Sequence, residues 1–544
     1  MTTSPASTLS LDDVREDPYG NGLAVKSLEE IVEPIDPRIR REDRPDDEQL
    51  DEGLARQLSD YIHHKDHHHQ PEDLEKSLTD SEILYVDFEK GDTRNPQNFS
   101  WRRKWTITLT ACFFTAISAA TTSTYTSGFP SMTRDLNCTQ FQATIGLSVY
   151  ALGFGIVPLI TASLSEEFGR LPLYIGSVFG FAAMHLMVAL SKNIQTVILA
   201  RFLAGAFGST GATMVGGTIA DIWLPYERGL PMSIFAVSAI SSSGIGPVAS
   251  GWIEMNPHLE WRWIQWIHLI VTGVYLFMIP VLMKETRSAV LLTRLAKKLR
   301  KDTGNHRYRA RAEDERGSLR TLIFISCTRP LHLLITEPTV FSFSLWIGFA
   351  WGIFYGMIES ISPIFKKLHN FNSGQTGTVF VCMAIGSFLG LLTNLYQERL
   401  YQKYFPTRGP EARLYCACAA AVLFPIGMFI YAWSSFPFVH WLGLAFGITI
   451  FLWALFIIYL AVFTYLADCY GPFASSALAG QSLCRNLAGM AFPLFSQQMY
   501  DRLSYKWSST LFACIAVVMI PIPFILFFYG PAIRARSKFS SKVM

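Results

Sequence analysis

The chain has 544 residues; half are hydrophobic, and only 16% are Asp, Glu, Lys or Arg. Soluble domains usually carry a charged share of roughly a quarter, so this composition excludes an ordinary soluble globular protein. The net charge of +3 conceals an uneven distribution, because 25 of the 43 acidic residues but only 11 of the 46 basic residues lie within the first 95 positions. The net charge therefore gives no indication of a nucleic-acid partner, and none is expected.

The first hundred residues are rich in Asp, Glu, Pro, Ser and Arg and contain too few apolar residues to bury a core. We expect a disordered acidic tail there. Its histidine cluster, from His63 to His69, lacks the cysteines or fixed acidic spacing of a metal site. The nine cysteines of the chain likewise show no zinc or disulfide spacing, so we expect no metal and no cofactor.

From Lys104 onward, apolar runs of about 20 residues recur, and this is the length that crosses a bilayer. Six runs precede a gap and six follow it. The pattern predicts an all-α membrane protein with twelve transmembrane helices in two six-helix bundles. The predicted spans are about 105–127, 143–164, 172–191, 196–218, 230–252, 264–284, 340–361, 376–396, 413–433, 441–466, 474–497 and 509–530.

Basic residues predict how these parts are oriented. The parts are a tail (1–100), an N-terminal bundle (101–284), a linker (285–335), a C-terminal bundle (336–532) and a second tail (533–544). Arginine and lysine crowd the linker and also flank the first and last spans. The positive-inside rule therefore predicts that the linker and both termini are cytoplasmic.

The two halves are also locally similar in sequence. The fourth span ends in TIADIWLP with Asp221, and the tenth ends in TYLADCYGP with Asp468. The helix after each carries a proline, Pro247 or Pro493. These similarities indicate a parallel six-plus-six repeat, which in transporters places the substrate site between the repeats.

A short charged turn, ASLSEEFGRLP, separates spans two and three. Glu166 and Arg170 stand four residues apart in it, and Gly169 directly precedes the arginine. An acid and an arginine at this spacing can pair with each other or with a neighbouring carboxylate. The alternative is a solvated turn whose charges only obey the topology rules.

Three further features lie within the apolar runs. Arg201 and Arg485 fall inside spans four and eleven, where an arginine is costly unless it faces a polar interior. Span five contains SSSGIGPVASG, in which Gly246 and Pro247 combine a helix-bending proline with small residues that let another helix approach.

Span seven supplies a candidate cavity lining, with Trp351, Tyr355 and Glu359, and span ten adds Tyr459. Aromatic rings give flat surfaces for organic ligands. Glu359 is a candidate for proton exchange or for pairing a cationic substrate; the alternative is an exposed glutamate beside Lys366 and Lys367. Two histidines in spans, His185 and His268, are either proton relays or packing residues.

Together these stretches resemble the major facilitator superfamily, and specifically the twelve-span drug:proton antiporters of fungi, of the polyamine and multidrug exporter type. The resemblance covers about residues 90–540. Glu166, Ala162 and Leu171 replace the usual Asp, Gly and second basic residue of the first motif. The resemblance implies the major facilitator fold, a gating charge relay of Glu166, Arg170 and Asp221, and a Gly246–Pro247 motif that favours export.

The implied function is that of a secondary active transporter and not an enzyme. It would export drugs, polyamines or a secondary metabolite in exchange for protons by alternating access. The alternative is a proton symporter or facilitator for uptake of a small organic nutrient. The expected partners are the small-molecule substrate, protons and the lipid bilayer, and we expect a monomer in the plasma membrane, with the vacuolar membrane as the alternative.

Overall fold

The computed structural model describes residues 83–89, 91–224, 227–314, 318–537 and 539–540. Within these residues, ten helical segments are long and apolar enough to cross a membrane. Two of the ten, Ser373–Trp433 and Ala474–Ala535, contain 61 and 62 residues. Each of these two folds back on itself and so provides two crossings. Twelve crossings result, in agreement with the sequence.

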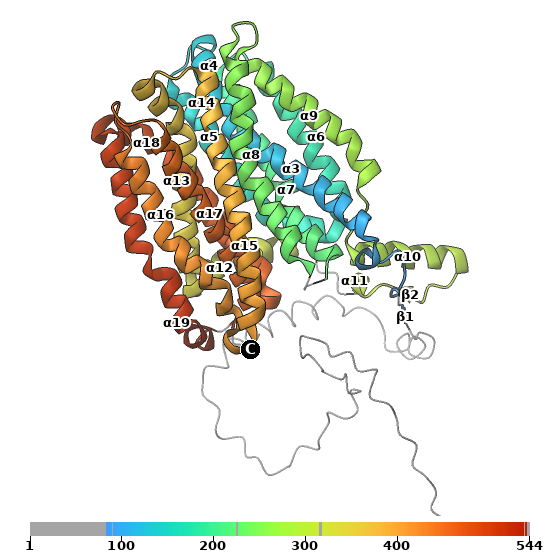
Figure 1. The fold of residues 1–544 in the computed structure, drawn as a ribbon. Helices are drawn as coiled ribbons and strands as arrows, with labels where there is room; N and C mark the ends of the chain where they lie inside the picture. The colour runs from blue at the N-terminus through green and yellow to red at the C-terminus, as the bar shows by residue number, and fades with distance from the viewer. Residues whose placement is uncertain (1–82, 90, 225–226, 315–317, 538, 541–544) are drawn as a thin grey trace, which may run out of the picture. The chain divides into compact units, whose positions relative to one another are not determined.

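The N-terminal bundle is drawn in blue to green in Figure 1. Capping and turn residues mark the starts of the second and third crossings. The Thr139 side chain and Gln142 form a reciprocal capping box at the second crossing, and Gly169 alone separates the second crossing from the third. The helices are α3 (Trp101–Ser127), α4 (Phe129–Asp135), α5 (Gln140–Phe168), α6 (Arg170–Ala189), α7 (Ile194–Ile222), α8 (Gly229–Met255) and α9 (Glu260–Leu282).

The C-terminal bundle, yellow to red in Figure 1, repeats this order. Asn372 and Gln375 form a second capping box at the start of its second crossing, the position that corresponds to Thr139. The chain reverses at Ser504, whose φ of 66° interrupts α18. The helices are α13 (Pro338–His369), α14 (Ser373–Val379), α15 (Val381–Arg408), η5 (Gly409–Leu414), α16 (Tyr415–Trp433), α17 (Leu442–Tyr470), η6 (Gly471–Phe473), α18 (Ala474–Met519) and α19 (Pro521–Ala535).

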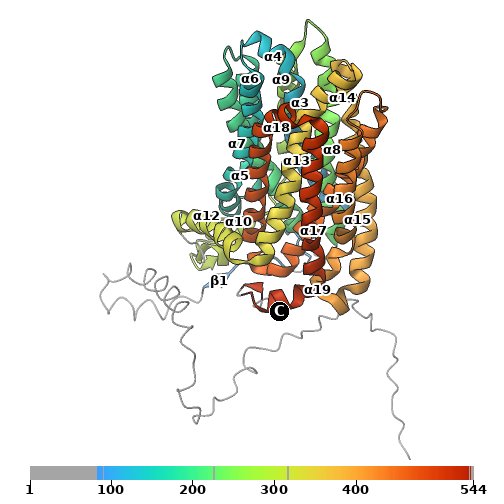
Figure 2. The same cartoon turned by 90° about the vertical axis from the view of Figure 1, so that its left-hand side faces the viewer.

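The segment between the bundles is more structured than a loop. It contains α10 (Ser288–Thr303), β2 (Tyr308–Arg309), α11 (Arg311–Asp314) and α12 (Leu319–Thr336). Both views place α10 and α12 at one end of the helices and α4 and α14 at the other (Figures 1 and 2). We call these the linker end and the opposite end.

The prediction of disorder up to residue 100 is wrong for its last part. Strand β1 (Leu84–Tyr85) pairs in parallel with β2, and η3 (Pro96–Asn98) precedes α3. The N–H groups of Leu84 and Val86 donate to the carbonyls of Arg307 and Arg309 at 2.9 and 2.8 Å. Backbone pairing needs no apolar side chains, so composition does not reveal it. The histidine cluster and the rest of the predicted tail lie outside the described residues.

Candidate functional site

At the linker end of the N-terminal bundle, Arg170 and Asp221 form an ion pair. The Arg170 Nε lies 3.1 Å from Asp221 Oδ2, and Arg287 approaches the other carboxylate oxygen at 3.5 Å. Arg170 also donates to the hydroxyl of Ser165 at 2.6 Å. Two members of the predicted relay are therefore in contact.

Glu166, the third predicted member, is not part of this cluster. Its side chain is exposed and makes no hydrogen bond or ion pair with any described residue. It faces a cavity of about 200 Å³ that α10 lines from the other side, with Thr293 and Arg294 among its residues. The prediction failed because Glu166 lies on the last turn of α5, where one helical step turns a side chain away from the bundle.

Glu285, and not Glu166, is the glutamate that holds the turn before Arg170, through backbone N–H groups. Its carboxylate accepts the backbone N–H groups of Arg170 (2.9 Å), Leu171 (3.2 Å), Thr286 and Arg287 (both 3.0 Å). Gly169, with φ of 96°, leaves room for it, because a Cβ there would lie 2.3 Å from Glu285 Oε2. The available signal was an acid directly after a span, in KETR.

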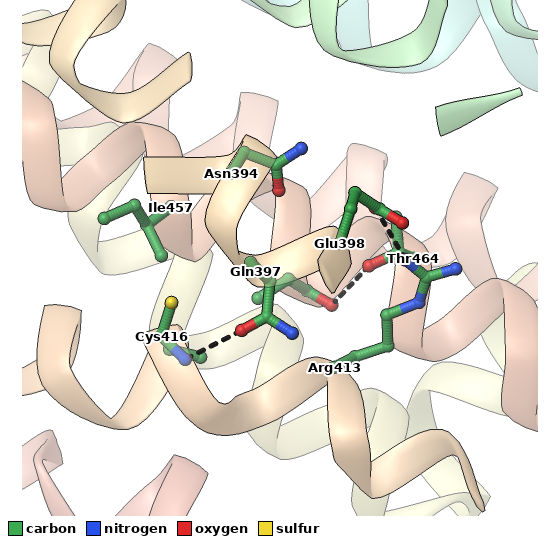
Figure 3. Close-up of a pocket in the computed structure, with 9 residues that line it drawn as sticks. Asn394, Gln397, Glu398, Arg413, Cys416, Ile457 and Thr464 are labelled. Carbon is green, nitrogen blue, oxygen red and sulfur yellow. Dashed lines mark hydrogen bonds and ion pairs between the residues drawn. The ribbon is translucent and has the colours of Figure 1, made fainter. Parts of the chain in front are cut away.

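The C-terminal bundle carries the equivalent arrangement at the same end. Arg413 binds Asp468 at 3.0 Å and Glu398 at 2.7 Å, and Tyr401 donates to Asp468 at 3.0 Å. Figure 3 shows Arg413 and Glu398 beside Gln397, whose amide oxygen accepts the N–H of Cys416 at 2.9 Å. The similarity between Asp221 and Asp468 thus extends to the structure: Asp221 pairs with Arg170, the first residue of α6, and Asp468 pairs with Arg413, in η5 just before α16.

Arg201 lies buried between two aromatic rings. Its guanidinium carbon stands 4.1 Å from the ring centre of Tyr125 and 4.4 Å from that of Tyr150. It donates to the carbonyls of Gly146 (3.3 Å) and Thr121 (3.2 Å), while Nη2 has no acceptor. Only 1% of the residue is exposed, so this arginine faces the protein interior and not lipid.

Arg485 has a similar environment in the other bundle. Its guanidinium carbon lies 4.5 Å from the ring centre of Trp351 and 5.1 Å from that of Tyr459, and these two rings stack at 5.7 Å. The structure therefore brings Arg485 of α18 together with two of the residues predicted to line a cavity, Trp351 of α13 and Tyr459 of α17. Tyr355, one helical turn beyond Trp351, packs beside Gly489 of α18.

Glu359 continues the same face of α13 as Trp351 and Tyr355, because the three residues are spaced four apart. The residue is 4% exposed, so the alternative of an exposed glutamate is wrong. The Thr144 hydroxyl, on α5 of the other bundle, donates to its Oε1 at 2.6 Å, while Oε2 has no partner. Thr144 was not identified from the sequence, because only the tertiary fold brings it to Glu359.

The proline motif of α8 makes a close backbone contact with α14 of the other bundle at the opposite end. A Cβ on Gly377 of α14 would lie 2.3 Å from the Pro247 carbonyl, and one on Gly251 would lie 2.6 Å from the Ser373 carbonyl. Small residues thus let the two backbones touch. Gly246 points elsewhere, toward Ala120 and Thr124 of α3.

The two span histidines stack on each other inside the N-terminal bundle, with ring centres 5.1 Å apart. His268 contacts the hydroxyls of Thr121 (3.3 Å) and Thr124 (2.9 Å). His185 contacts Gln265 at 3.0 Å. They form a polar cluster on α6 and α9 that touches the Arg201 site through Thr121 of α3, because Thr121 contacts both His268 and Arg201.

The model of the Major Facilitator Superfamily matches residues 111–468. The chain belongs to the Major Facilitator Superfamily. This facilitator is 33% identical to an MFS-type efflux pump of Trichophyton rubrum, over 86% of this chain and 79% of the relative. It is 32% identical to a multidrug transporter of the superfamily from Aspergillus fumigatus, over 86% and 77%. Both relatives are named as efflux or multidrug transporters, and this chain is a transporter of the same superfamily.

The fold of the facilitator agrees with that of solved transporters. The xylose transporter of Escherichia coli, in a partially occluded inward-open conformation, superposes with a TM-score of 0.56 at 14% identity, over 79% of this chain and 99% of that one. At this identity the similarity shows the fold alone. The predicted fold class, a major facilitator fold within an integral membrane protein, is therefore confirmed.

Proposed function

We propose that this transporter exports small organic molecules in exchange for protons, by alternating access, and that Glu359 carries the proton. Drugs and other xenobiotics, polyamines and secondary metabolites are the candidate substrates. The observation that carries the proposal is the place of Glu359: a buried carboxyl on α13, bonded across the bundle interface to Thr144.

The physical argument concerns the cost of burying charge. No basic side chain pairs with Glu359 among the described residues, and one of its oxygens has no partner. Burying a carboxylate without a basic partner costs free energy, so the closed arrangement favours the protonated form of Glu359. Separation of α5 from α13 would break the bond to Thr144 and admit water, which favours the charged form. Gain and loss of a proton at Glu359 would thus be tied to the closing and opening of the opposite end.

The gating part of the proposal assigns roles at both ends. Arg170 and Asp221, with Glu285 holding the turn, would stabilise one access state at the linker end. Pro247, whose carbonyl lies against α14, would let α8 rock on the other bundle, and Gly246 would let it pack closely on α3. The basic linker supports a cytoplasmic linker end, and we place the monomeric transporter in the plasma membrane with both termini in the cytoplasm.

The test uses Glu359→Gln, which removes the charge and keeps the shape, and Glu359→Asp, which keeps the charge. Cells with each variant are loaded with labelled candidate compounds, and efflux is measured with and without a protonophore. The Gln variant should lose export or its protonophore sensitivity, while the Asp variant retains part of both. Asp501→Asn, an exposed carboxylate at the opposite end, is the matched control.

An unchanged rate and unchanged protonophore sensitivity in Glu359→Gln would contradict the proton role. Coupling would then lie elsewhere, and His185 and His268 would be tested next. Protonophore-sensitive accumulation in place of efflux would favour the alternative, an uptake symporter.

A further inference from the structure

Several buried hydrogen-bond donors in the described part of the chain have no acceptor. Three of them lie on residues of the candidate site: Nε of Arg485, Nη2 of Arg201 and the indole N–H of Trp351. Arg485 and Arg201 are 9% and 1% exposed. A buried donor without a partner costs about 1–3 kcal/mol, and more when the group is charged. Unpaired donors in the interior of a transporter indicate a ligand that supplies acceptor oxygens.

Neither arginine has a carboxylate partner within the described part of the chain. The ion pairs of the bundles lie at the linker end, as for Arg170 and Arg413, or at the opposite end, as for Arg134 and Glu260. Glu359, the acid in the interior, is bonded to Thr144 instead. The interior therefore keeps two positive charges that no acidic side chain compensates.

The surroundings of Arg485 also specify the shape of a ligand. The guanidinium stacks against Trp351 and Tyr459, whose rings lie nearly parallel, at 28°. Flat rings bind flat organic bodies, and Arg485 uses only one hydrogen bond, to Ser482 on its own helix at 3.3 Å. A planar molecule with an acidic group could stack on the rings and occupy the free guanidinium donor.

We infer that the substrate is an organic anion, a carboxylate on a flat aromatic body, whose acidic group binds Arg485 and the Trp351 indole N–H. Arg201, with its own unpartnered Nη2, adds positive charge from the other bundle. This inference rests on the proposed function and narrows it, because it disfavours polyamines. A polycation would approach two unpaired guanidinium groups and find one interior carboxyl.

The test compares three probes with one aromatic body and different head groups: 1-naphthoate, 1-naphthamide and 1-naphthylmethylammonium. Binding is measured to the full-length protein in lipid nanodiscs. Naphthoate should bind about tenfold more tightly than the amide, since a hydrogen bond to a charged group is worth about 1.5–3 kcal/mol. The ammonium probe should bind most weakly.

Two variants locate the effect. Arg485→Gln should reduce naphthoate binding to the level of the amide, and Arg485→Lys, which keeps the charge, should retain part of the difference. Arg502→Gln removes an exposed charge at the opposite end and should change nothing. The lysine variant keeps the test valid should the glutamine variant fail to fold.

Equal binding of naphthoate and naphthamide, or binding of no probe, would overturn the inference. So would a naphthoate preference that survives in both Arg485 variants. These results leave proton-coupled export untouched, which the efflux assay with a protonophore tests separately. Export that ignores the protonophore would contradict the proposed function without affecting the order in which the three probes bind.

Discussion

The two bundles are built alike at the linker end and differently inside. Each pairs an arginine before its third crossing with an aspartate at the end of its fourth, Arg170 with Asp221 and Arg413 with Asp468. Inside, the N-terminal bundle holds stacked histidines and an arginine between tyrosines, whereas the C-terminal bundle holds an arginine beside tryptophan and tyrosine. The two bundles are thus alike in the ion pairs to which the proposed function assigns gating, and they differ in their interiors.

The interior arginines should give the largest effects. Arg201→Ala and Arg485→Ala should each lower export by about tenfold or more, because burying an arginine at this depth is costly and we expect such a residue to face the transport path. They should differ in stability. Arg201 donates to carbonyls on α5 and α3, so its loss should also lower the melting temperature. Among the described residues, Arg485 forms its hydrogen bond within its own helix and otherwise stacks on Trp351 and Tyr459, so its loss should lower the melting temperature less.

Efflux normalised to surface protein, together with melting of the purified protein, checks both statements. Arg502→Ala serves as the control. Wild-type export in either variant would show that this arginine is not needed for transport. Equal shifts in melting temperature would contradict the predicted difference in stability between the two variants.

The glycines before the two arginine turns should give the next largest effect. Gly169 and Gly409 both have positive φ, 96° and 63°, which strains any other residue by about 1–3 kcal/mol. A Cβ on Gly169 would also strike the Glu285 carboxylate at 2.3 Å, whereas one on Gly409 meets nothing closer than 3.7 Å. Gly169→Ala should therefore destabilise by about 3 kcal/mol and Gly409→Ala by about 1.

Denaturation of the purified variants under identical detergent conditions measures this difference. The control is Gly176→Ala, because a Cβ at this position would meet no other atom within 4 Å. A larger loss of stability in Gly409→Ala than in Gly169→Ala would contradict the closer packing at Gly169.

The aspartates should give a smaller and again unequal effect. Asp221 is the sole carboxylate that pairs with Arg170 among the described residues, whereas Arg413 keeps Glu398 when Asp468 is lost. Both pairs are partly buried, so Asp221→Asn should cost about 2 kcal/mol and Asp468→Asn about 1. Melting and efflux of the two variants test the order, and the double variant shows whether the two turns act independently.

The N-terminal tail, which precedes both bundles, should give the smallest effect. Deletion of residues 2–81 leaves β1 and its pairing with β2 in place, and we expect export within about twofold of wild type because an acidic tail of this composition supplies no packed core. Efflux and surface localisation of the shortened protein check this. Loss of localised activity would show that the tail takes part in transport or targeting.

Sequence alone predicted the twelve crossings because one physical quantity, the apolar length of a bilayer, decides them. It also selected Arg201, Arg485 and Glu359, since burying charge is costly wherever the partner lies. It missed Glu285 and Thr144, because their roles exist only through contacts between distant segments. It misplaced Glu166 for a related reason: the spacing was correct, but side-chain direction at a helix end depends on the fold.

The unpaired arginines have an electrical consequence. Arg201 and Arg485 stay in the protein through each cycle, so they add no net charge to what crosses the membrane. With an anion leaving and one proton entering, two positive charges would move inward per turnover. A membrane potential, negative inside, contributes about 2.3 kcal/mol per charge for each 100 mV. Such an exporter would draw much of its driving force from voltage, and would keep working when the pH difference across the membrane vanishes.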